Sequence, residues 1–153
     1  MKVSPKIVVI TLLVAILGFL TEANGPLGMF WAPGSDMPTP AGAQVPLFMF
    51  LGAAEALALG VSVSFLLFGY SSLKMNATVS PSLTRATHLS IVWLLGNWWA
   101  HDSLHQHNGM NLGGLLRIEY GFHITLIIAG LTLVRFFLAV TRIPAAEPAL
   151  TAR

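Results

Sequence analysis

Apolar residues in this chain are arranged in four long blocks, separated by polar or Gly/Pro-rich stretches. The blocks cover about residues 7–21, 46–72, 86–105 and 112–140. Their lengths are close to the roughly 20 apolar residues with which a helix crosses the roughly 30 Å hydrocarbon layer of a bilayer. Continuous apolar blocks differ from the short periodic runs of a soluble core. The pattern therefore predicts an all-α integral membrane protein, a four-helix bundle in which residues 1–153 form a single transmembrane domain.

The connections between the blocks differ in composition. Residues 22–45 are rich in Gly and Pro and predict a loop without a continuous helix. The sequence His-Asn-Gly at 107–109 predicts a tight turn, because Asn-Gly tolerates positive φ. So short a turn makes the third and fourth helices antiparallel neighbours.

The first block has two interpretations. Lys2 and Lys6, the apolar run over 7–20 and then Thr-Glu-Ala describe either a retained transmembrane helix or a signal peptide. The apolar run is short for a transmembrane helix and at the long end for a signal peptide. Both interpretations place the N-terminus in the cytoplasm, so the orientation of the other helices does not depend on the choice.

Positive charges orient the predicted bundle. They occur in the N-terminal tail, in the second connection and towards the C-terminus, at Lys2, Lys6, Lys74, Arg85, Arg135, Arg142 and Arg153. The first and third connections contain no Lys or Arg. By the positive-inside rule both termini are cytoplasmic, and the Gly/Pro-rich loop and the His-Asn-Gly turn are extracytoplasmic. The formal net charge is only +2 and the basic residues are scattered, so the lipid bilayer, not nucleic acid, is the expected partner.

Titratable residues gather in the outer half, although only 9 % of the chain is charged. His101 and His105 are four residues apart on the third predicted helix, and Glu119 and His123 are four apart on the fourth. Each pair therefore lies on one helical face. At 1.5 Å of rise per residue, all four lie within about 16 Å of the outer surface. Two antiparallel helices would thus present two pairs of ligands across one seam.

These residue types predict a transition-metal site. The candidate ligands are His101, His105, Glu119 and His123, with Glu55 next and His107 or Asp102 as ligands or support. Glu55 is included because an ionised carboxylate within a transmembrane helix costs several kcal/mol unless it has a partner or a function. The chain has no Cys, and imidazole with carboxylate suits copper, iron or zinc. Copper is slightly preferred over iron and zinc, because thioethers favour Cu(I). Three methionines are predicted on the extracytoplasmic side: Met29, Met37 and Met110.

Other hypotheses remain beside this one. A bis-histidine haem, a less favoured cofactor, requires His101 or His105 to face His123 at one depth. A non-catalytic accessory subunit would use the same polar residues as an interhelical hydrogen-bond network. Proton conduction ranks last, because His88 is nearly the only titratable group in the cytoplasmic half. The leading hypothesis is a redox or metal-handling role at the extracytoplasmic face, with a membrane protein or a second copy as partner; no motif identifies a substrate.

Overall fold

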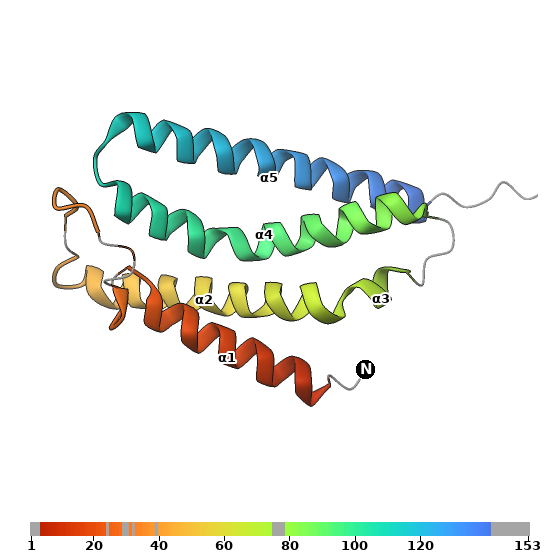
Figure 1. Cartoon of the computed structure of the whole chain (residues 1–153), viewed down its shortest axis with the longest axis horizontal. Helices are drawn as coiled ribbons and strands as arrows, with labels where there is room; N and C mark the ends of the chain where they lie inside the picture. Colours follow the sequence, from red (N-terminus) through yellow and green to blue (C-terminus); the bar gives the residue numbers. More distant parts are fainter. Residues whose placement is uncertain are drawn as a thin grey trace, which may run out of the picture.

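The computed structural model describes residues 4–23, 25–28, 31, 33–38, 40–74 and 79–141. It contains four long helices, α1 (Pro5–Thr21), α2 (Gln44–Phe68), α4 (Pro81–Asn108) and α5 (Leu112–Thr141), and a short helix, α3 (Tyr70–Lys74) (Figure 1). No strand occurs among these residues. The all-helical class is therefore confirmed, and a helix lies over each of the four apolar blocks.

Local chemistry explains where helix boundaries differ from the prediction. α4 begins at Pro81, earlier than expected, because Ser80 caps it. The Ser80 hydroxyl accepts the backbone N–H of Leu83 at 3.4 Å, and proline is favourable in the first helical turn. The second predicted block is divided at Gly69 into α2 and α3. Both differences concern capping and helix interruption, which apolar periodicity does not report.

The long helices lie side by side in the order α1, α2, α4, α5 (Figure 1). α1 packs on α2, α2 packs on α4, and α4 packs on α5. α1 also reaches α4 where the Trp99 indole N–H donates to the carbonyl oxygen of Gly18 at 2.9 Å. Among the described residues no extensive contact joins α1 to α5. The contacts therefore describe an open layer rather than a closed four-helix bundle.

Small and polar side chains hold the helices together, whereas large apolar side chains lie outside. The Ser62 hydroxyl donates to the carbonyl oxygen of Val92 at 2.7 Å, and the hydroxyls of Thr11 and Ser64 lie 2.7 Å apart. Leu, Ile, Val and Phe side chains are exposed along α1, α2 and α5. The buried apolar side chains of the described chain are few: Ala23, Ala56, Val79, Ala129 and Phe136. Such a distribution is typical of helices packed in lipid, where small and polar residues form the interfaces.

Two helices, α2 and α5, are long and apolar enough to cross a membrane. α1 is apolar but has 17 residues. α4 is less apolar, and it lies between α2 and α5, where its polar residues Thr84, Thr87, His88, Asn97 and Ser103 are buried. The four-pass topology and the cytoplasmic termini stay predictions, and Lys2, Arg142 and Arg153, on which the orientation depends in part, lie outside the described residues.

Candidate metal centre

The C-terminal end of α4 and the N-terminal end of α5 are joined by a tight turn at residues 109–111 (Figure 1). Gly109 adopts φ +61°, as the Asn-Gly sequence predicts. The Gly/Pro-rich loop between α1 and α2, called the outer loop after the predicted topology, is docked on this turn. The Asp36 carboxylate accepts the backbone N–H of Met110 at 3.0 Å, and the Gly34 N–H donates to the carbonyl oxygen of Gln106 at 2.8 Å. These contacts fix the end of the seam between the two helices.

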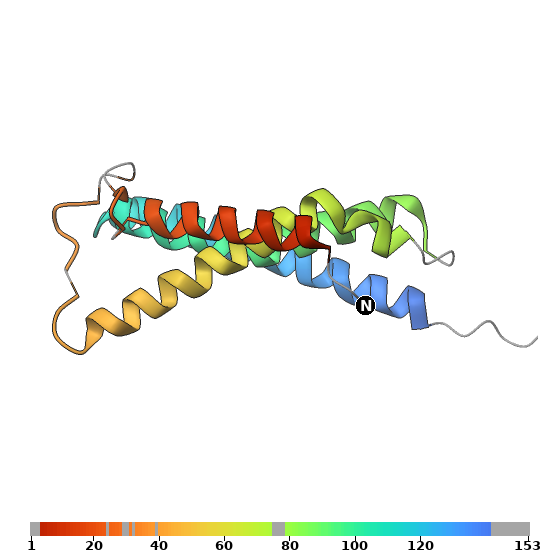
Figure 2. The same cartoon turned by 90° about the horizontal axis from the view of Figure 1, so that it is seen from below.

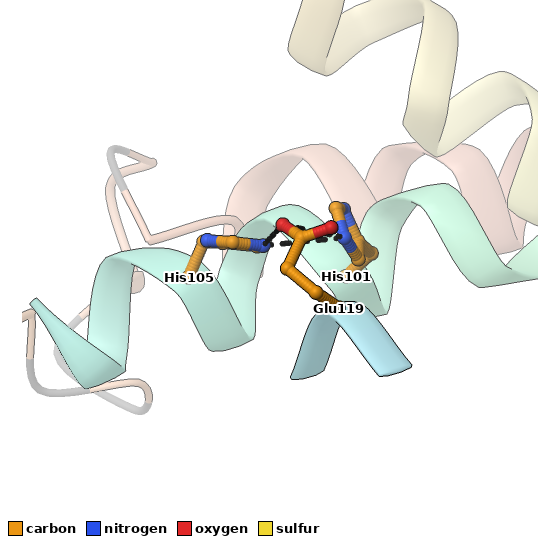
Figure 3. Close-up of side chains that lie close together, drawn as sticks. All are labelled: His101, His105 and Glu119. Atoms are coloured by element: carbon orange, nitrogen blue, oxygen red, sulfur yellow. Dashed lines mark hydrogen bonds and ion pairs between the residues drawn. The ribbon is translucent and has the colours of Figure 1, made fainter. Parts of the chain in front are cut away.

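Two imidazoles of α4 and one carboxylate of α5 meet across this seam (Figure 3). His105 Nε2 lies 2.9 Å from Glu119 Oε1 and 3.2 Å from His101 Nε2. His101 Nε2 lies 4.0 Å from the same carboxylate oxygen. With these three separations, one point lies about 2 Å from all three atoms, which is the usual distance from a transition metal to nitrogen and oxygen ligands. Among the described residues this is the one group of three whose ligand atoms lie close enough to hold a metal ion.

His123 contacts Glu119 at the exposed edge of the interface between α4 and α5. Its Nδ1 lies 2.8 Å from the carbonyl oxygen of Glu119 and 3.0 Å from Glu119 Oε2. A carbonyl oxygen only accepts, so Nδ1 is the protonated nitrogen and donates to Glu119. The His123 side chain is 57 % exposed. The structure thus places this predicted ligand beside the group of three, in contact with one of its members.

Asp102 lies behind His101, on the nitrogen that does not face Glu119. Its Oδ1 is 3.6 Å from His101 Nδ1, which is an ion-pair distance rather than a hydrogen bond. His101 Nδ1 is buried and has no hydrogen-bond partner. A carboxylate at the second nitrogen of an imidazole orients the ring and raises its basicity. Asp102 is therefore placed to support His101 rather than to join the three ligand atoms.

Aromatic rings close the seam beneath this group. The ring of Phe122 lies 5.0 Å from the ring of His101, and Trp93 stacks on Phe122 at 5.4 Å with an interplanar angle of 24°. The Trp93 indole N–H donates to the Thr125 hydroxyl at 3.0 Å, which fixes the ring. An apolar floor excludes water and strengthens electrostatic interactions at the group above it.

Glu55 lies on α2, on the other side of α4, and is not a member of the group of three. Its carboxyl group instead lies near the acidic side chain of Asp102, and its buried Oε2 has no hydrogen-bond partner. Glu22, directly after α1, belongs to the same acidic neighbourhood. Burial, and then the negative charge of Asp102, raise the pKa of the Glu22 carboxyl above its ordinary value. No Lys or Arg of the described chain forms an ion pair with any of these carboxyl groups.

His107 is also outside the group of three. Its Nδ1 donates to the carbonyl oxygen of Trp31, and its side chain is exposed in the last turn of α4. Trp31 in turn lies edge-on against Trp99 at 5.4 Å. His107 therefore connects α4 to the outer loop.

Sequence reasoning missed the anchoring role of Asp36, which carries no local motif. It also missed the meeting of Glu22 with Glu55 and Asp102, although their shared outer position was a usable signal. The protein-family models, curated proteins and solved structures compared with this chain include no match.

Proposed function

We propose that this chain is an integral membrane protein that binds one first-row transition-metal ion, with His101, His105 and Glu119 as ligands. The observation that carries the proposal is the convergence of their three ligand atoms within 4.8 Å. A cation at this point neutralises Glu119, which has no Lys or Arg partner in the described chain. His123 and Asp102 contact two of the ligands from behind, an arrangement typical of metal sites.

The membrane setting is supported by α2 and α5 and by the exposed apolar side chains along three helices. The distribution of Lys and Arg favours an extracytoplasmic position for the metal centre. Placing three ionisable side chains, His101, His105 and Glu119, within a bilayer costs free energy. A bound cation offsets this cost. The role we propose is redox chemistry or metal handling at that face.

Copper is our first choice of metal, because divalent copper has the highest affinity for nitrogen and oxygen ligands in the first row. Iron comes next, since two histidines and one carboxylate with open positions also form non-haem iron sites. Zinc binds the same set of ligands. The proposal does not extend to haem, because Glu119 Oε1 occupies the space beside both imidazole nitrogens.

Elemental analysis of the detergent-purified protein tests this function. We expect about one copper, iron or zinc ion per chain, bound through the three ligands. The variant His101→Ala with His105→Ala should lose the metal, whereas His107→Ala should retain it, because His107 contacts the outer loop instead. Metal far below one per chain that is the same in all three proteins would refute the proposal.

The open layer favours a second candidate function, that of an accessory subunit in a membrane complex. Among the described helices α5 packs extensively only on α4, and its other faces expose apolar side chains. In this role the group at the seam would be a hydrogen-bond network. A metal-free protein that purifies in mild detergent with a second membrane protein would favour this function; a monodisperse metalloprotein would argue against it.

A further inference from the structure

The first turns of α2 stand apart from the other helices (Figure 2). Every residue from 41 to 51 is exposed. A cleft of about 290 Å³ lies between this end of α2 and the end of α1. Its apolar wall includes Phe19, Pro26, Val45, Phe48 and Met49. Small-molecule sites have this character and begin at about this volume.

One charged side chain, Glu22, lines this apolar cleft. No Lys, Arg or His of the described chain lies within ion-pair distance of it. A β-carbon added at Gly52 would collide with both carboxylate oxygens of Glu22, so the absence of a side chain there makes room for the carboxyl group. Its nearest charged neighbours, Glu55 and Asp102, are also acidic. The cleft therefore combines an apolar wall with one carboxyl group that has no basic partner among the described residues.

We propose that this cleft binds a small organic ammonium ion, whose charge lies at Glu22 and whose apolar part packs on Phe19, Phe48 and Met49. The aromatic rings of Phe19 and Phe48 add a cation–π attraction. A hard metal cation would need six or more oxygen ligands, which a wall of this composition does not offer. An acyl chain in the cleft would leave a desolvated carboxyl group without a partner. This proposal stands independently of the metal centre.

The test uses the full chain in dodecyl maltoside micelles and radiolabelled phenyltrimethylammonium in equilibrium dialysis. We expect saturable binding that tert-butylbenzene, the uncharged compound of the same shape, does not displace at equal concentration. Glu22→Gln should weaken the affinity at least about tenfold, because it removes the charge partner. Val45→Trp should block binding by filling the cleft while Glu22 stays in place. Gel filtration and circular dichroism verify that both variants are folded.

Glu119→Gln is the matched control, because it changes the metal centre and leaves the cleft intact. Unchanged binding in this variant supports the proposal, and loss of binding there would overturn it by placing the ammonium ion at the metal centre. Equal affinity in Glu22→Gln, or equal displacement by tert-butylbenzene, would also overturn it. Displacement by dihexanoylphosphatidylcholine supports the same ammonium chemistry, supplied by a lipid headgroup instead of a free ion.

Discussion

At the scale of single residues, Glu119 distinguishes a metal site from a hydrogen-bond network. Glu119→Gln keeps the size and most hydrogen bonds of this side chain but removes its negative charge. As a ligand, the carboxylate must be ionised, so we expect the metal affinity to fall by at least about 100-fold. A titration against a competing chelator measures this loss, and circular dichroism verifies that the helices remain.

Glu55→Gln is the control for this experiment, since Glu55 lies outside the group of three. We expect its metal affinity to stay close to that of the unmodified protein. Full metal occupancy in Glu119→Gln, together with loss of metal in Glu55→Gln, would show that the carboxylate ligand is Glu55 on α2 and not Glu119 on α5.

His123 is predicted by the structure to position Glu119 rather than to bind the metal. His123→Asn keeps a side-chain N–H donor but removes the imidazole. We expect the copper affinity to fall by about tenfold, the lower end for residues that orient ligands. The electron paramagnetic resonance spectrum of bound Cu(II) should stay the same, because the ligand atoms do not change. A spectrum with altered g values would show instead that His123 is a direct ligand.

Glu22 makes the stability of the metal-free protein depend on pH. Its pKa is raised from 4.5, first by burial and then by Asp102, so the folded state prefers the protonated carboxyl group. The stabilisation is complete below the ordinary pKa and is lost as pH rises through the raised value. Glu22→Gln is neutral at every pH, so its unfolding temperature should decline less as the pH is raised above 4.5, measured with a chelator present. Parallel declines in the two proteins would contradict the raised pKa.

At the scale of helices, the sequence predicted which residues share a face and that α4 and α5 are neighbours, but not which helix packs on the other face of α4. The spacing of four residues on two antiparallel helices was sufficient to bring His101, His105 and Glu119 together. Glu55 was grouped with them because of its depth and the cost of an ionised carboxylate in a transmembrane helix, not because of a shared helical face. It lies across α4, because the angular position of each helix depends on packing that depth does not describe. His107 also lies outside the group of three, and its Nδ1 donates to a backbone carbonyl of the outer loop, a contact that helical spacing does not predict.

The packing of α1 on α2 depends on a glycine at their closest approach. A β-carbon at Gly60 would collide with the carbonyl oxygen of Thr11, whereas one at Gly121 on α5 would meet nothing within 4 Å. We therefore expect Gly60→Leu to lower the free energy of unfolding by about 1–3 kcal/mol through overpacking. Gly121→Leu should have little effect, because its side chain points into open space. Denaturation in detergent, followed by circular dichroism, compares the two; equal losses would contradict the close contact.

At the scale of the whole molecule, the polar groups and the apolar surface together define an orientation. The loop between α1 and α2 and the α4–α5 turn occupy one end of the layer, and α3 lies at the other (Figure 1). α2 and α5 can each cross a bilayer. The sequence predicted that the loop and the turn lie at the same end, since both lack Lys and Arg, and the structure agrees on this point; which side of a membrane that end faces stays a prediction. It did not predict the open layer, because the apolar faces of helices contact lipid equally well in an open layer and in a closed bundle.

The absence of cysteine makes this orientation directly testable. The chain contains no Cys, so a single introduced thiol reports only its own position. Ser35 in the outer loop and Ser72 in α3 are both exposed, so each accepts the substitution without burying a thiol. With the outer loop extracytoplasmic, Ser35→Cys in intact cells should react with a membrane-impermeant maleimide, and Ser72→Cys should react only after permeabilisation. The reverse pattern would invert the topology, and labelling of both in intact cells would show that the layer does not cross the membrane.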